Sequence, residues 1–190
     1  MQRALWFVIL LVLGFCAPAL GAVELKSGVF TPPRAAPAFT LQGSNGAPLT
    51  LESFHGKVVL LGFGFSSCKE VCPITLNTLA QAHKQLGAQA SELQVIYITV
   101  DPKRDDAARL SQYLGHFNPS FLGGTGSAAE LAAVRKEYGI LAEKRTNADG
   151  EYSHSSFVYL IDRKGLLRAL MTYGHEPQDY VHDVRVLLSE

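Results

Sequence analysis

The stretch 57–73, KVVLLGFGFSSCKEVCP, joins an apolar run directly to two cysteines. Residues 58–65 carry no charge and are rich in β-branched and aromatic side chains, as in a strand buried on both faces. Apolar residues then recur at helical spacing between positions 74 and 86, and Gly87 predicts the end of a helix. The cysteines therefore follow a buried strand and stand at the beginning of a helix.

Outside this stretch, the pattern alternates strands with helices. Further strands are predicted at residues 93–100, 121–122, 156–162 and 166–173, and further helices at 106–117, after Ser127, and at 177–188. Asp105 and Ser127 are expected to cap the helices that they precede. Two short strands around Asn45-Gly46 predict an N-terminal β-hairpin. Together these elements predict an α/β fold whose mixed central sheet is flanked by helices.

The composition limits the classes of function. The chain has 190 residues, 47% of them hydrophobic, with 17 basic and 17 acidic side chains and no net charge. This length suits one domain with a substantial core, and the neutral balance argues against both a disordered chain and a nucleic-acid partner. Three cysteines are too few for a disulfide-dense scaffold, so we expect them to act chemically.

The N-terminal segment predicts export. Arg3 precedes an uncharged apolar run that ends in small residues, which is typical of a signal peptide. The run also approaches the length of a bilayer span, so residues 1–22 are interpreted as a signal peptide or membrane anchor, with Pro18 favouring cleavage. Lipid attachment at Cys16 is a third possibility, against which the bulky residue before it argues.

The domain is expected to follow this segment on the far side of the membrane. Residues 23–38 contain three prolines and predict an extended linker, so the folded domain is placed at 39–190. Because a lone positive charge holds the N-terminus inside, the domain is expected on the periplasmic side of the inner membrane, soluble or anchored.

Cys68 and Cys72 are the candidate reactive residues. Four positions apart at a helix start, they share one face and lie close enough to hold one metal ion or to form a disulfide. Structural zinc sites need four ligands and there is no second cysteine pair, whereas two thiolates with an imidazole suit Cu(I). Of the six histidines, His154 immediately precedes a predicted strand, which would fix its position. The structural alternative is a disulfide bond between Cys68 and Cys72 whose only role is to stabilise the fold.

Four segments resemble the SCO/SenC family: GKVVLLGF at 56–63, CxxxCP at 68–73, TVDPKRD at 99–105 and YSHSSFVYLID at 152–162. The resemblance implies a thioredoxin-like fold and a copper chaperone that assists assembly of the binuclear copper site of cytochrome c oxidase. It implies that Cys68, Cys72 and His154 bind one copper ion per chain, as Cu(I), with Asp101 as an orienting group. The implied partners are the oxidase subunit that receives copper, or another copper acceptor, and a thioredoxin-like reductant.

The sequence departs from the family pattern beside the cysteines. Lys69 stands where the family usually has proline, and Ser66-Ser67 replaces a common threonine. In thioredoxin-like oxidoreductases, a cis-proline stands before the strand that corresponds to the one following His154 here. Residues 154–156 contain no proline, which favours metal binding over general disulfide exchange. The alternative function is a thiol–disulfide oxidoreductase that reduces the acceptor's cysteines, with Cys68 and Cys72 as its redox pair and Cys68 as nucleophile.

Overall fold

The structure is a computed structural model that describes residues 24–144 and 152–190. Its centre is an eight-stranded mixed sheet with strand order β1-β10-β9-β4-β5-β6-β2-β3, and β7 pairs with β8 in a small second sheet. The strands are β1 (Gly28–Ala35), β2 (Thr40–Gly43), β3 (Pro48–Thr50), β4 (Val58–Gly64), β5 (Leu93–Thr99), β6 (Leu122–Thr125), β7 (Ala142–Lys144), β8 (Tyr152–His154), β9 (Val158–Ile161) and β10 (Leu166–Met171). The helices are α1 (Val71–Leu86), α2 (Ala107–Gly115), α3 (Ala128–Glu137) and α4 (Pro177–Leu188), with 3₁₀ turns at Glu52–Phe54 and Gly87–Glu92.

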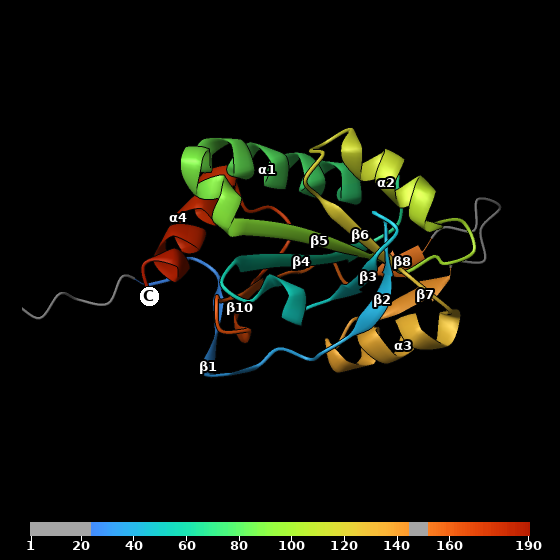
Figure 1. Cartoon of the computed structure of the whole chain (residues 1–190), viewed down its shortest axis with the longest axis horizontal. Coiled ribbons are helices and arrows are strands. Elements are labelled where there is room, and N and C mark those ends of the chain that lie inside the picture. Colours follow the sequence, from blue (N-terminus) through green and yellow to red (C-terminus); the bar gives the residue numbers. More distant parts are fainter. Residues whose placement is uncertain (1–23, 145–151) are drawn as a thin grey trace, which may run out of the picture.

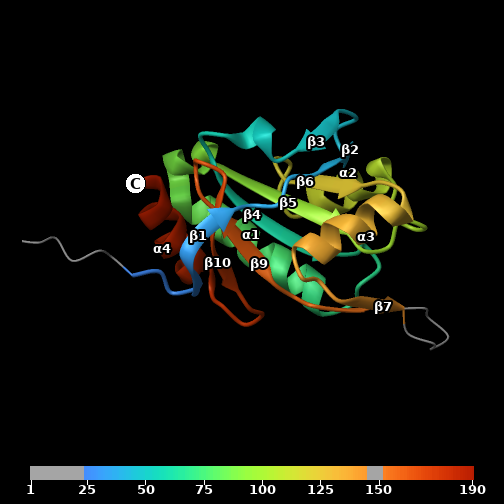
Figure 2. The ribbon, with the colours of Figure 1, turned by 90° about the horizontal axis from the view of Figure 1, so that it is seen from below.

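Helices cover both faces of the central sheet. Figure 1 shows α1 and α2 on one side and α3 on the other, and α4 packs against α1. The second view, in Figure 2, places α3 in front of the sheet and α1 behind it. Strands β2 and β3 form the expected hairpin, with residues 40–42 paired to 48–50. The predicted α/β architecture with a mixed sheet and an N-terminal hairpin is therefore confirmed.

Strands β4 and β5 form the middle of the sheet and are buried along their whole length. They pair in parallel, while β9 pairs antiparallel with the other edge of β4. Because both faces are covered, every position needs a side chain that tolerates burial, which explains the continuous apolar runs in the sequence. Since β4 ends at Gly64 and α1 begins at Val71, the loop that carries Cys68 is fixed at both ends.

The segment expected to be a linker is part of the sheet. Gly28–Ala35 forms β1, which pairs antiparallel with β10, so the folded unit differs from the predicted start at residue 39. Asp183 on α4 also accepts hydrogen bonds from the backbone N–H groups of Lys26 (2.8 Å) and Ser27 (3.0 Å). The segment is extended, as predicted, and its prolines are tolerated because β1 is an edge strand. An exposed edge strand has no apolar pattern by which a sequence could reveal it.

One local prediction differs from the structure, and one element was not predicted at all. Asp106 caps α2, because its carboxylate accepts from the backbone N–H of Arg109 at 2.7 Å; Asp105 does not. The β7–β8 hairpin was not predicted, since three-residue strands carry too little pattern. Ser127 does cap α3, through a reciprocal capping box with Glu130.

Within residues 24–144 and 152–190, none of the helices combines the length and the apolar character needed to cross a bilayer. The predicted signal peptide or anchor at 1–22, including Cys16, lies outside the described residues.

Candidate metal centre

The two cysteines flank the start of helix α1. Cys68 lies in the loop after β4 and is half-buried, while Cys72 lies in the first turn of α1 and is 2% exposed. Both are free thiols, and the backbone N–H of Cys72 points to Cys68 Sγ at 3.4 Å. The helix therefore begins close to where predicted, with one backbone N–H of its first turn directed at a sulfur.

His154 lies beside this pair although it is 82 positions after Cys72 in the sequence. It is the last residue of β8, and its Nε2 atom lies 3.6 Å from Cys72 Sγ. Its other ring nitrogen, Nδ1, lies 2.9 Å from the carbonyl oxygen of Ser155, which requires Nδ1 to carry the proton and donate. A neutral ring then keeps the lone pair of Nε2 free and directs it at the sulfur. The edge-to-face contact with Phe65, at 5.9 Å between centroids, holds the ring in place.

The two thiols have opposite electrostatic surroundings. Hydrogen bonding to Cys72, assisted by His154, lowers the pKa of Cys68 to about 4, against the opposing effect of burial. Hydrogen bonding to Cys68 raises the pKa of Cys72, and burial raises it further. The metal-free pair therefore holds a thiolate at the accessible sulfur and a proton at the buried one.

Asp101, expected as an orienting group, does not touch the sulfurs. Its side chain is buried and forms an ion pair with Arg104, and its backbone N–H donates to Thr99 Oγ1 at 3.0 Å. The Arg104 guanidinium lies over the ring of Phe65, 5.9 Å from its centroid, and that ring contacts His154. The side chain of Asp101 is therefore connected to the site through Arg104 and Phe65.

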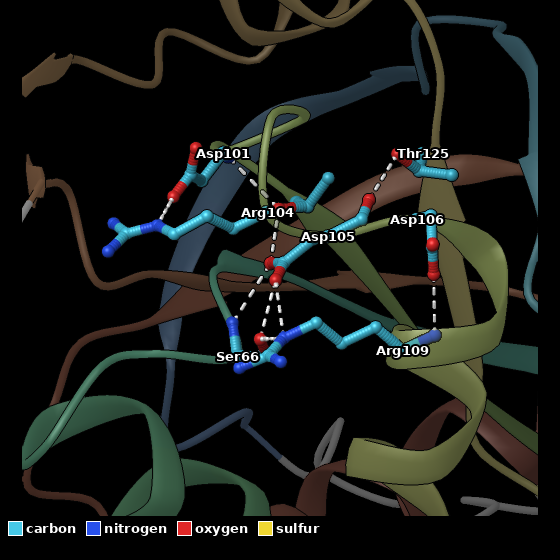
Figure 3. A network of polar contacts seen from close by, with 8 residues as sticks. Ser66, Asp101, Arg104, Asp105, Asp106, Arg109 and Thr125 are labelled. Carbon is cyan, nitrogen blue, oxygen red and sulfur yellow. Dashed lines mark hydrogen bonds and ion pairs between the residues drawn. The ribbon is translucent and has the colours of Figure 1, made fainter.

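Asp105 is the polar residue of the site that sequence reasoning missed. Its carboxylate is fully buried and accepts hydrogen bonds from the backbone N–H of Ser66 (2.9 Å), the Ser66 hydroxyl (2.5 Å) and the Thr99 hydroxyl (2.7 Å). Figure 3 shows this network, in which Arg109 Nε also donates to Ser66 Oγ at 2.7 Å. Because Ser66 is two residues before Cys68, Asp105 ties the cysteine loop to the end of β5. Its position before a helix suggested a cap, and only the fold reveals the buried role.

The three predicted ligands lie close together, although they are not arranged as a complete metal site. Within the described part of the chain, no three His, Cys, Asp or Glu side chains are arranged as a ready-made metal site. Cys72 Sγ is in contact with His154 Nε2, and Cys68 Sγ accepts from the backbone N–H of Cys72, so two sulfurs and one imidazole nitrogen lie near one another. That donor set is soft and suits Cu(I).

The other five histidines are placed elsewhere: the His55 ring lies beside Gly165, and the remaining four have partners of their own. His83 contacts Asn118, His116 the carbonyl of Gln112, His175 the carboxylate of Asp179, and His182 that of Asp183. His154 is thus the histidine that the fold delivers to the cysteines.

Comparison with known proteins gives a consistent set of relatives. A family model described as SCO1/SenC matches residues 30–189. The chain is 35% identical over 132 residues to a "SCO2-like protein" of Rickettsia felis, a match that covers 67% of this chain and only 64% of that relative. Copper-bound ScoI of Bradyrhizobium japonicum has a TM-score of 0.74 at 31% identity, covering 81% of this chain and 99% of that one. Copper-bound yeast Sco1 has a TM-score of 0.74 at 29% identity, covering 83% and 90%. These likenesses confirm the predicted thioredoxin-like fold.

Proposed function

The chain belongs to the SCO1/SenC family, and from this membership and the site geometry we propose that it is an exported copper-binding metallochaperone. Its task is to assist assembly of the binuclear copper site of cytochrome c oxidase. Copper is the cargo, carried as one Cu(I) ion per chain, and Cys68, Cys72 and His154 are its ligands. The two solved structures compared above both contain copper, which supports this choice of metal.

The contact between Cys72 Sγ and His154 Nε2, 3.6 Å long, is the observation that carries the proposal. Donors that share one ion through bonds of about 2.0–2.3 Å lie no more than roughly 4.5 Å apart, so this pair already satisfies the requirement. The hydrogen bond from Nδ1 to the Ser155 carbonyl fixes the tautomer that a ligand needs.

The exposure of the two sulfurs suits a carrier that must release its cargo. Cys72 is buried, whereas Cys68 is half-buried and stands in a loop. An acceptor's thiol can therefore reach the ion from the Cys68 side and replace this ligand first. Because Cys72 must lose its thiol proton when metal binds, uptake releases a proton and weakens as the pH falls.

Copper stoichiometry tests the proposal. The purified protein is reduced, loaded with Cu(I) without oxygen, desalted and assayed for copper, and X-ray absorption counts sulfur and nitrogen neighbours. We expect one copper per chain with two sulfur ligands and one nitrogen ligand. His154→Ala should lose the nitrogen neighbour and bind at least about tenfold more weakly, while His83→Ala, the matched control, should bind as the wild type does. A wild-type protein that retains no copper would refute the proposal.

Thiol–disulfide exchange is the second candidate function, and the asymmetry of the cysteine pair favours it. A half-buried sulfur with a pKa of about 4 is a thiolate at neutral pH and makes the natural attacking group, with Cys72 as the resolving thiol. The substrate is then the oxidised cysteine pair of the copper acceptor, and a thioredoxin-like reductant regenerates the dithiol. Turnover that persists in His154→Ala and disappears in Cys68→Ser would establish this activity.

The compartment follows from the proposed export. The domain resides on the periplasmic side of the inner membrane, released or held by its N-terminal segment. Fractionation of cells that express the full chain, with protease added to spheroplasts, tests this: protection of the domain from the protease contradicts export.

A further inference from the structure

The buried hydroxyl of Tyr97 lies beside the copper site and has no partner. Tyr97 is in the middle of β5, is 2% exposed, and its hydroxyl makes no hydrogen bond to any residue that the structure describes. An unpaired buried hydroxyl costs about 1–3 kcal/mol of stability. A phenylalanine would fill the same space without this cost, so the position of the hydroxyl needs an explanation.

Two glycines in β4 determine where this hydroxyl lies. Gly62 pairs with Tyr97 across the sheet, and a Cβ atom added at Gly62 would stand 3.2 Å from the tyrosine ring. A Cβ at Gly64 would stand 1.6 Å from Tyr97 Oη. The ring therefore lies along β4 from Gly62 towards Gly64, in space that any other residue's side chain would occupy.

The ring is directed at the buried cysteine. The same added Cβ at Gly64 would lie 2.9 Å from Cys72 Sγ, so Tyr97 Oη and Cys72 Sγ both lie within 2.9 Å of one point above β4. Tyr97, Cys72 and His154 also line one small cavity. The sulfur is therefore close enough to serve as the acceptor for the unpaired hydroxyl.

We propose that the Tyr97 hydroxyl donates a hydrogen bond to Cys72 Sγ and so acts as a positioning residue for this sulfur, both in the copper site and when the sulfur attacks Cys68 in disulfide exchange. A thiol sulfur is a weak acceptor. A thiolate is a strong acceptor, and bonds to charged groups are about twice as strong as neutral ones. The hydroxyl thus holds the sulfur in the position from which it binds metal or attacks a disulfide. The part that concerns copper rests on the proposed function.

Tyr97→Phe tests the proposal, because it removes one oxygen and leaves the ring. Tyr138→Phe is the matched control: Tyr138 is also a buried tyrosine, but its hydroxyl donates to the Pro37 carbonyl at 2.8 Å, outside the site. Cu(I) affinity is measured by competition with a chromophoric chelator. We expect Tyr97→Phe to bind about tenfold more weakly, as for one lost charge-assisted hydrogen bond, and Tyr138→Phe to be unchanged.

A metal-free measurement separates this inference from the proposed function. With glutathione disulfide, the Cys68 thiolate displaces one glutathione thiolate, and the Cys72 thiolate then attacks Cys68 and displaces the second, so two electrons pass to glutathione. We expect Tyr97→Phe to slow the second step about threefold, because Cys72 Sγ loses the hydrogen bond that positions it for the attack on Cys68. The control should close at the wild-type rate.

The outcomes are distinct. If wild-type protein binds no Cu(I), the proposed function fails, and the closure rate still decides the role of Tyr97. If Tyr97→Phe matches the wild type in both measurements, or if both variants are impaired equally, the proposal is overturned. Far-UV circular dichroism of each variant verifies that the fold is intact.

Discussion

Replacing Asp105 by alanine should destabilise the protein far more than replacing its neighbour Asp106. Asp105→Ala leaves the buried Thr99 hydroxyl and the Ser66 backbone N–H without their acceptor. Each such loss costs about 1–3 kcal/mol, so we expect the free energy of unfolding to fall by roughly 3–5 kcal/mol. Asp106→Ala removes one exposed helix cap, at about 1 kcal/mol. The two variants change the charge equally, which makes Asp106 a matched control.

Urea denaturation of the reduced, metal-free protein, followed by circular dichroism, measures both losses. Asp105→Ala should also bind Cu(I) more weakly, because Ser66 no longer fixes the loop that carries Cys68, whereas Asp106→Ala should retain wild-type affinity. If Asp106→Ala lowers the free energy of unfolding as much as Asp105→Ala does, then Asp105 is not the residue that ties the cysteine loop to β5 through the network in Figure 3.

Three further predictions test other parts of the structure. Because the pKa of Cys68 is lowered to about 4, its alkylation by iodoacetamide, followed by peptide mass analysis, should be nearly independent of pH between pH 5.5 and 7.5; a tenfold rise per pH unit would contradict the thiolate. Gly64→Ala should cost at least about 1–3 kcal/mol in urea denaturation by overpacking, while Gly115→Ala, whose added Cβ meets nothing within 4 Å, should cost nothing. Asp183→Ala should expose residues 24–35 to limited proteolysis, because Lys26 and Ser27 lose their acceptor; an unchanged cleavage pattern would show that β1 is held without it.

The central elements could be predicted because burial leaves a clear pattern. Strand β4 needs apolar or small residues at every position, and this run is visible in the sequence. The cap of α3 is equally local, since Ser127 and Glu130 satisfy each other across three residues. Strand β1 could not be found in this way, because its side chains mostly face solvent and it is ordered by distant partners, namely β10 and the Asp183 carboxylate.

The site was predictable to the extent that its residues are chemically distinctive. Cys68 and Cys72 are conspicuous by spacing, and the prediction that His154 lies near them agrees with the observed contact to Cys72. Their role as copper ligands stays a prediction. Asp105 and Tyr97 could not be recognised, because an aspartate before a helix looks like a cap and a tyrosine in an apolar strand looks like ordinary core. Their partners are 39 and 25 positions away in Ser66 and Cys72, and only the sheet brings them together.

The supporting residues divide between the two sulfurs, and this division bears on how the proposed site would release copper. The loop around Cys68 depends on Asp105, which is held by hydrogen bonds to the end of β5, whereas Cys72 is fixed by helix α1, His154 and the space over Gly64. A partner that disturbs the loop can therefore detach Cys68 without moving Cys72 or His154. Loosening one ligand while two hold the ion would let copper pass to an acceptor without ever being free in solution.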